Sequence, residues 1–199
     1  MYIAIEGPIG VGKTTLTRHL AQALEGEALF EVVEENPFLP LFYEDPEHYA
    51  FKVQVFFLLS RYKQLEHLAQ PRLFERAVVA DYLFDKDFIF ASLNLEGHEW
   101  GLYQELYQSL APRIATPDLT IYLRAPLEVL LERIRRRGRS FERGIDPGYL
   151  ERLTEAYDRH FARYRGRLWV FDNTDVNYAD DAAAAHWVTR QVLARASVD

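Results

Sequence analysis

The chain of 199 residues contains no cysteine. This absence excludes a disulfide framework, a thiolate nucleophile and a cysteine-ligated zinc site, so any catalysis must rely on oxygen and nitrogen groups. An excess of positive charge is missing too, because the formal net charge is −7. A general binder of nucleic acid polymers would carry a basic surface, so the substrate is expected to be small.

Long hydrophobic runs are also missing. The most apolar stretch, from Tyr49 to Leu59, is interrupted by Lys52 and Gln54 and is too short to cross a bilayer. The first residues lack the basic region and cleavage site of a signal peptide, so we expect a cytoplasmic protein without a membrane contact. The length favours a single domain over residues 1–199.

Short apolar runs alternate with helical patterns along the chain. The expected strands are Tyr2–Glu6, Ala28–Glu34, Arg76–Asp81, Leu119–Leu123 and Leu168–Phe171. The expected helices are Lys13–Leu24, Asp45–Gln70, Phe88–Asn94, Trp100–Leu110, Pro126–Arg137, Pro147–Arg165 and Ala179–Ala196. This alternation predicts an α/β fold, a five-stranded parallel sheet with helices on both faces.

A phosphate-binding loop follows the first strand. Residues 7–14 read Gly-Pro-Ile-Gly-Val-Gly-Lys-Thr and fit the pattern G-x-x-x-x-G-K-[ST] between a predicted strand and a predicted helix. In such a P-loop, backbone N–H groups surround the phosphates, the lysine reaches the β and γ phosphates and the threonine ligates magnesium. We therefore expect Mg-ATP bound by Gly7, Gly10, Gly12, Lys13, Thr14 and Thr15, with Thr14 as the metal ligand.

A P-loop alone does not separate kinases from GTPases or oligomeric ATPases. A guanine-reading N/TKxD motif is missing, since Asn173-Thr174-Asp175 lacks the lysine. The chain also leaves little room for the extra modules of an oligomeric ATPase. A kinase of small molecules is favoured.

Four further groups of residues follow the P-loop in a specific order. They are Glu34–Phe38, then Phe42–Pro46 with Gln54 and Arg61, then Ile89–Ser92, and last Arg137–Arg139 with Glu142–Tyr149. In order and spacing they resemble the deoxyribonucleoside kinases of the deoxycytidine, deoxyguanosine and deoxyadenosine kinase group. The resemblance implies a P-loop kinase fold with an arginine-rich lid at about residues 137–145. It also implies transfer of the ATP γ-phosphoryl group to a deoxynucleoside 5′-hydroxyl, with a purine favoured and deoxycytidine next, by a homodimer.

The general base is expected just after the second strand. Glu34 and Glu35 lie at the carboxyl end of that predicted strand, where open α/β sheets bind their ligands. A carboxylate there can accept the proton of an attacking hydroxyl. The resemblance implies such a glutamate, but this segment is shorter than usual and leaves the register open. Glu35, in contact with the acceptor, is favoured over Glu34.

The long predicted helix carries two polar residues on an otherwise apolar face. Gln54 and Arg61 are seven residues apart, hence two turns along one face. The resemblance implies that Gln54 binds the base edge and that Arg61 braces the site. It further implies that Tyr43 and Glu142 hold the sugar 3′-hydroxyl and that Leu39, Phe42 and Phe90 line the base pocket.

The resemblance also assigns two arginines at the end of the fifth predicted helix, Pro126–Arg137, and just after it. Arg137 and Arg139 match lid arginines that close over the triphosphate and neutralise charge on the transferred group.

The segment after the third strand departs from the family pattern. The family has an acidic residue, an arginine and a serine there, followed by an aspartate, whereas residues 81–87 read Asp-Tyr-Leu-Phe-Asp-Lys-Asp. Asp81 still ends the strand and is expected to position magnesium or the nucleophile. Whether Lys86 replaces the missing positive charge, or Asp85 or Asp87 serves near the base, stays open.

Two alternatives compete with this interpretation. A thymidylate-kinase-like nucleoside monophosphate kinase would need an acceptor-site arginine, and the segment Asp81-Tyr82-Leu83 lacks the expected Asp-Arg-Tyr triplet. In a regulatory ATP-binding module, Glu35, Gln54 and Glu142 would have no shared task.

Overall fold

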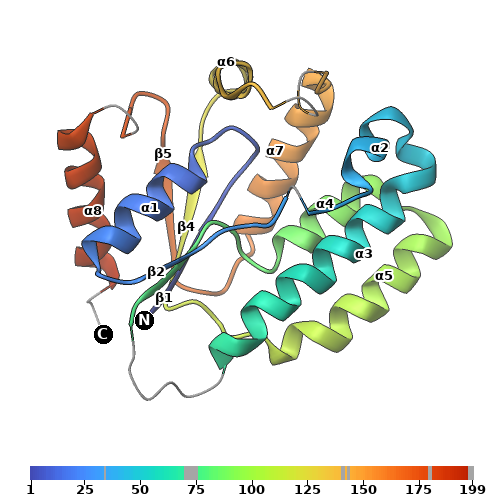
Figure 1. The fold of residues 1–199 in the computed structure, drawn as a ribbon, viewed down its shortest axis with the longest axis horizontal. Coiled ribbons are helices and arrows are strands. Elements are labelled where there is room, and N and C mark those ends of the chain that lie inside the picture. Colours follow the sequence, from blue (N-terminus) through green and yellow to red (C-terminus); the bar gives the residue numbers. More distant parts are fainter. Residues whose placement is uncertain (34, 70–75, 140–141, 143, 179–180, 197–199) are drawn as a thin grey trace.

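The structure, a computed structural model, describes residues 1–33, 35–69, 76–139, 142, 144–178 and 181–196. Its strands form one sheet in the order β2-β3-β1-β4-β5, with every neighbouring pair parallel (Figure 1). They are β1 (Tyr2–Glu6), β2 (Glu27–Leu29), β3 (Val78–Ala80), β4 (Leu119–Arg124) and β5 (Leu168–Asp172). The predicted five-stranded parallel sheet is thus confirmed.

Helices cover both faces of this sheet, as the alternating pattern predicts. Figure 1 shows α1 and α8 on one side and α3, α4, α5 and α7 on the other, with α2 and α6 near the carboxyl ends of the strands. The helices are α1 (Lys13–Ala23), α2 (Leu39–Glu44), α3 (Pro46–Leu65), α4 (Lys86–Asn94), α5 (Gly97–Leu110), α6 (Leu127–Arg137), α7 (Pro147–Phe161) and α8 (Ala182–Ala196), with the short 3₁₀ helices η1 (Glu66–Ala69) and η2 (Ala111–Arg113). No helix in the described ranges is long and apolar enough to cross a membrane.

The largest difference from the predicted elements lies in the second strand. The apolar run predicted a strand to Glu34, but β2 ends at Leu29. The backbone N–H of Asp81 donates to the Leu29 carbonyl at 3.0 Å, and the Asp81 carboxylate then accepts the backbone N–H of Glu31 at 2.7 Å. A side chain therefore replaces the neighbouring strand as hydrogen-bond partner, and the chain after Leu29 leaves the sheet.

Smaller differences concern the helices. Helix α2 is absent from the predicted elements, although the proline in its first turn, Pro40, suits the start of a helix. The long helix α3 ends at Leu65 and continues as η1, and Gln70, its predicted end, lies outside the described residues. Helix α7 ends at Phe161 rather than Arg165.

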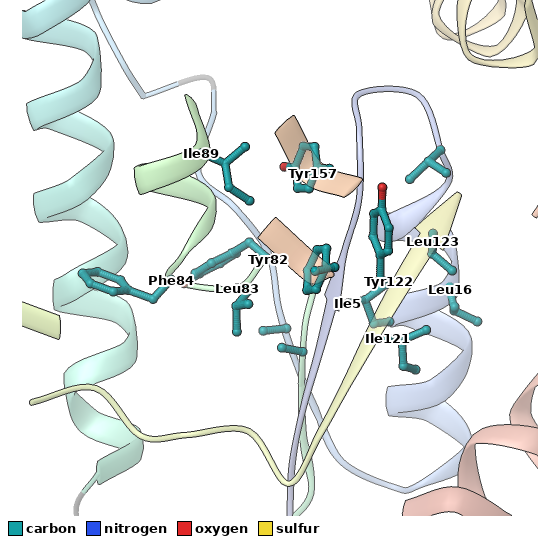
Figure 2. Packing of buried hydrophobic residues seen from close by; sticks show 14 of the residues in the cluster. Ile5, Leu16, Tyr82, Leu83, Phe84, Ile89, Ile121, Tyr122, Leu123 and Tyr157 are labelled. Atoms are coloured by element: carbon teal, nitrogen blue, oxygen red, sulfur yellow. The ribbon is translucent and has the colours of Figure 1, made fainter. Parts of the chain in front are cut away.

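The core lies on both sides of the central strands. Figure 2 shows Leu16 of α1 on one side of β4 and Ile89 of α4 with Tyr157 of α7 on the other. Leu16 and Tyr157 are fully buried, and Ile89 is 2% exposed. Burial of apolar side chains on both faces fixes the strands, and with them the loops at their carboxyl ends.

A buried carboxylate ties three of these loops and helices together. Glu6, at the end of β1, is fully buried and accepts the backbone N–H groups of Gly7 at 2.8 Å and Leu83 at 2.9 Å. It also accepts the Tyr157 hydroxyl at 3.0 Å. Glu6 thereby connects the P-loop entry to the segment after β3 and to α7.

Replacing Glu6 with glutamine should destabilise the fold by about 1–3 kcal/mol, because the amide NH₂ cannot accept and leaves one buried donor unpaired. Urea unfolding measures this change. The exposed Glu99→Gln variant of α5 is the matched control and should stay within about 0.5 kcal/mol of the wild type. Equal stability of the two variants would show that the Glu6 contacts do not matter.

Candidate active site

The P-loop joins β1 to α1 at the carboxyl edge of the sheet. Gly12, just before α1, has a φ of 105°, in the left-handed region that favours glycine. A Cβ at this position would lie 2.6 Å from the Tyr178 hydroxyl oxygen. Position 12 therefore has no room for a side chain, and the backbone N–H groups of the loop stay available for phosphates.

The ammonium group of Lys13 lies over this loop. It donates to the carbonyl oxygens of Gly7 at 2.6 Å and Pro8 at 3.1 Å. Burial, together with the nearby positive charge of Lys86, lowers the pKa of Lys13 to about 8. Both acceptors are neutral carbonyl groups, so a bound polyphosphate would supply the countercharge.

Asp81, just after β3, connects the P-loop to the segment after β2. Its Oδ2 accepts the Thr14 hydroxyl at 2.8 Å, and its Oδ1 accepts the Glu31 backbone N–H at 2.7 Å. The residue is 5% exposed. One rigid carboxylate thus fixes the P-loop threonine relative to Glu31.

The Glu31 carboxylate is held by two cations. Arg61 Nη2 donates to Glu31 Oε1, and Lys86 Nζ lies 2.5 Å from Glu31 Oε2. Burial alone would raise the pKa of Glu31, but the charges of Lys86 and Arg61 outweigh it and hold that pKa well below its usual range. Glu31 is therefore an ionised carboxylate at neutral pH.

Asp87 completes a buried charge cluster of Glu31, Arg61, Lys86 and Asp87. Arg61 Nη1 donates to Asp87 Oδ1. Burial raises the pKa of Asp87 well above its usual range, and the charge of Arg61 offsets only part of this effect. The cluster holds two acidic and two basic side chains, so pairing limits the cost of burying them.

A cavity of about 360 Å³ extends from the P-loop to α3, with Glu31, Arg61 and Lys86 of the charge cluster in its wall. Lys13, Thr14, Glu31, Asp81 and Lys86 lie at the P-loop end. The structure also brings to this cavity all but one of the residues expected to bind the acceptor, namely Leu39, Phe42, Tyr43, Gln54, Arg61, Phe90 and Glu142. Its lining further includes Phe30, Val33, Val53, Phe57 and Tyr149, which the sequence interpretation did not select.

Gln54 and Arg61 share one face of α3, as their spacing predicts. Both are buried, at 3% and 4% exposure, and both line the cavity. The guanidinium of Arg61 also stacks over Phe57, with 4.8 Å to the ring centroid. Within the described part of the chain, Gln54 forms no side-chain hydrogen bond, so its amide is available to a ligand.

Two arginines at the carboxyl end of α6 contact Glu142. Arg137 Nη2 donates to Glu142 Oε1 at 2.7 Å and to Oε2 at 2.6 Å, and Arg139 Nη1 lies 3.7 Å from Oε1. Glu142 is 5% exposed, whereas the two arginine side chains are about one third exposed. Residues 140, 141 and 143 of the predicted lid lie outside the described residues.

A second cavity of about 480 Å³ lies beside the P-loop, and Thr15, Arg137 and Arg139 are part of its lining. The segment after β5 supports the loop here. Asn173 Nδ2 donates to the Val11 carbonyl at 2.5 Å, and the Tyr178 hydroxyl donates to the Gly12 carbonyl at 3.2 Å. The P-loop is thus supported by the segment after β5 as well as by Asp81 after β3.

The structure corrects the expected position of the acidic residue after the second strand. Glu35 is exposed and does not line the cavity, and Glu34 lies outside the described residues. Because β2 ends at Leu29, the carboxylate that enters the cavity is Glu31. An available signal was that Glu31 is the only charged residue in the apolar run from Ala28 to Val33.

The structure also separates the residues that follow Asp81. Lys86 and Asp87 belong to the charge cluster, whereas Asp85 lies 3.0 Å from His160 and accepts the Tyr107 hydroxyl at 3.1 Å. Tyr82, at the place of the missing arginine, is fully buried and donates its hydroxyl to Gln64 at 2.8 Å. Position 82 therefore supplies no charge to the cavity.

Comparison with known proteins agrees with this geometry. Residues 3–195 match the family model described as deoxynucleoside kinase. A deoxyguanosine kinase of Bacillus subtilis (strain 168) is 42% identical over 158 residues, which cover 79% of this chain and 76% of the relative. A deoxyadenosine kinase of Lactobacillus acidophilus is 33% identical over 187 residues, covering 87% of this chain and 85% of the relative.

Solved structures give the same result for the fold. The deoxyadenosine kinase of M. mycoides with the products dCMP and a flexible dCDP bound superposes with a TM-score of 0.85 at 27% identity. The match covers 98% of this chain and all of the other. The same enzyme with bound dATP superposes with a TM-score of 0.83 at 28% identity, covering 97% and 99% of the two chains.

Binding of a triphosphate to the P-loop should be accompanied by protonation of Lys13 above pH 8. The unliganded pKa of Lys13 is lowered to about 8, and a bound polyanion raises it again, so the lysine must be protonated on binding. Titration calorimetry with a non-hydrolysable ATP analogue, in buffers of different ionisation enthalpy, should show uptake approaching one proton at about pH 8.5 and little at about pH 7.

Arginine cannot lose its proton in this range, so Lys13→Arg should abolish the uptake. The exposed Lys52→Arg variant is the control and should retain it. Identical proton uptake at both pH values in the wild type would contradict the lowered pKa.

Proposed function

The chain belongs to the deoxynucleoside kinase family, and from this premise we propose that it transfers the γ-phosphoryl group of ATP to the 5′-hydroxyl of a purine deoxynucleoside. Enzymes of this family are ATP-dependent phosphotransferases of nucleotide salvage. The observation that carries the proposal is the single cavity that joins Lys13 and Thr14 of the P-loop to Gln54 of α3. The family match also decides against a thymidylate-kinase-like enzyme and a regulatory module.

Purine preference is supported by the relatives. The two curated relatives described above are named deoxyguanosine kinase and deoxyadenosine kinase. A Bacillus subtilis relative, 32% identical, is named deoxyadenosine/deoxycytidine kinase. We therefore rank deoxyadenosine or deoxyguanosine first and deoxycytidine next.

The proposed donor is ATP with magnesium, held by Gly7, Gly10, Gly12, Lys13, Thr14 and Thr15. The hydroxyl of Thr14 and the carboxylate of Asp81 are hard oxygen ligands 2.8 Å apart, which suits Mg²⁺. No group of three or more His, Asp or Glu side chains among the described residues could hold a metal, and Mg²⁺ in kinases takes few protein ligands besides the phosphates. When bound, the ion neutralises charge on the β and γ phosphates.

We assign the role of general base to Glu31 rather than to Glu35. Glu31 is ionised and lies in the cavity beside the P-loop lysine, whereas Glu35 faces solvent. As the 5′-oxygen forms its bond to the γ-phosphorus, the bond to the bridging oxygen breaks and ADP leaves. The hydroxyl proton passes to Glu31.

The acceptor base is proposed to lie against Gln54. Its amide offers a donor and an acceptor side by side, which suits the edge of a purine. Leu39, Phe42 and Phe90 supply apolar walls, and we assign Tyr43 and Glu142, which line the same cavity, to the sugar 3′-hydroxyl. Arg61 braces this site through Glu31 and Asp87 rather than by touching the nucleoside.

Residues 137–145 are proposed to act as a lid within a single catalytic domain of residues 1–199. Arg137 and Arg139 line the cavities on both sides of the P-loop, which supports their role over the triphosphate. Their positive charge would neutralise the transferred phosphoryl group.

We further propose a homodimer that works in the cytoplasm, where its donor ATP is made and used. Leu59 of α3 and Leu102 of α5 are 44% and 50% exposed on two helices that pack side by side. Light scattering of the purified protein and cell fractionation decide these two points. A monomer at high concentration would reject the dimer.

Glu31→Gln should lower kcat by about 10² to 10⁴ while the KM for the deoxynucleoside changes little, because glutamine keeps the shape but cannot accept the proton. Steady-state kinetics measure both constants. Glu35→Gln is the matched control and should be nearly wild type, since this side chain is exposed. A low kcat in Glu35→Gln together with a nearly wild-type kcat in Glu31→Gln would instead assign the role of general base to Glu35.

The function itself is tested by offering deoxyadenosine, deoxyguanosine, deoxycytidine, thymidine and dTMP with Mg-ATP. We expect the purine deoxynucleosides to be the best acceptors. Gln54→Leu should lower kcat/KM for them by about ten- to a thousandfold, since each unpaired buried base group costs roughly 1–3 kcal/mol.

ATP affinity should hardly change in Gln54→Leu, because the P-loop is a separate part of the cavity. Gln108→Leu, an exposed change on α5, is the control and should keep wild-type efficiency. No phosphorylation of any of the five compounds by the wild type rejects the proposed function. Wild-type efficiency of Gln54→Leu rejects only the base site.

A further inference from the structure

The charge of Lys86 is unfavourable where it lies, both because the side chain is buried and because it stands at the start of a helix. It is the first residue of α4 and is 6% exposed. A buried ammonium loses its hydration, and the N-terminus of a helix carries positive potential that repels a cation. The position therefore demands a compensating negative charge in the cavity.

Glu31 supplies only part of that charge. Its Oε1 is already bonded to Arg61, which also bonds Asp87, so this arginine alone would fix the carboxylate. Lys86 contacts the second oxygen, Oε2, at 2.5 Å, and its ammonium lies 5.6 Å from the Phe90 ring centroid in the acceptor wall. The Lys86 ammonium thus enters the cavity between Glu31, the proposed general base, and Phe90, a wall of the proposed nucleobase pocket.

Two ammonium groups converge on the same region from opposite elements. Lys13 comes from the P-loop and Lys86 from α4, and both line the cavity. Their mutual repulsion contributes to the lowered pKa of Lys13. An anion between them would relieve this repulsion, and in a kinase that anion is the group in transfer.

We propose that Lys86 is a catalytic residue whose ammonium donates to the phosphoryl group as it passes from ATP to the acceptor. This inference rests on the proposed function. The 5′-oxygen bonds to the γ-phosphorus, ADP leaves with the electron pair of the broken bond, and Glu31 takes the hydroxyl proton. Lys86 keeps its own proton throughout and supplies charge alone.

Kinetics of the full chain with ATP and the best deoxynucleoside test this role. Lys86→Met should lower kcat by about 10² to 10³ and leave both KM values within about threefold. Lys86→Arg, which retains the charge, should recover at least about tenfold of that loss. Lys63→Met, an exposed change on α3, is the matched control and should be wild type.

A double-mutant cycle separates direct action from mere orientation of Glu31. If Lys86 contacts the phosphoryl group, Lys86→Met should cost at least about a further tenfold in the Glu31→Gln background. No further loss there would overturn the proposal, as would an unchanged kcat with a raised nucleoside KM.

Thermal unfolding accompanies each measurement, because the methionine variant leaves the cluster with an excess of negative charge. If Lys86→Met does not fold, Lys86→Gln, which keeps a donor without the charge, takes its place, and wild-type turnover of that variant overturns the proposal. A wild-type protein that phosphorylates no deoxynucleoside would instead overturn the proposed function.

Discussion

The active site depends on the position of one carboxylate, that of Asp81. Its two oxygens bind the Thr14 hydroxyl and the Glu31 backbone, so the P-loop and the segment after β2 share a single anchor at the end of β3. Because β3 lies between β2 and β1, this anchor is held by strands on both sides. Transfer in line requires donor and acceptor to be placed within fractions of an ångström, and a short, buried link is a direct way to provide this.

The buried charge cluster adds a second constraint. Glu31, Arg61 and Lys86 share the wall of one cavity, with the fully buried Asp87 bonded to Arg61, and each contact in the cluster joins opposite charges. Removing one member would leave a buried charge uncompensated, which costs more than the pair itself contributes to stability. The cluster is therefore better understood as a means of holding Glu31 ionised and oriented than as a source of stability.

Most of the fold followed from local patterns. The P-loop, the alternation of strands with helices, and the spacing of Gln54 and Arg61 each depend on neighbouring residues, and each of these features has the predicted place. The identity of the proposed base did not follow, because it depends on where β2 leaves the sheet. A distant residue, Asp81, decides that point by capturing the Glu31 backbone, and no periodicity of residues 28–34 contains this information. For the same reason the sequence did not separate Lys86 and Asp87, which join the charge cluster, from Asp85, which lies beside His160.

The contact between Arg137 and Glu142 joins the proposed lid to the proposed sugar site. The same carboxylate is assigned to the sugar hydroxyl and is here occupied by a lid arginine. If Arg137 binds the triphosphate as proposed, it must release Glu142, and donor binding would then free an acceptor for the sugar. Linkage is reciprocal at equilibrium, and the nucleoside, by competing for Glu142, must in turn raise the affinity for the donor by the same factor. With the proposed roles of Arg137 and Glu142, this one ion pair would couple the two binding events.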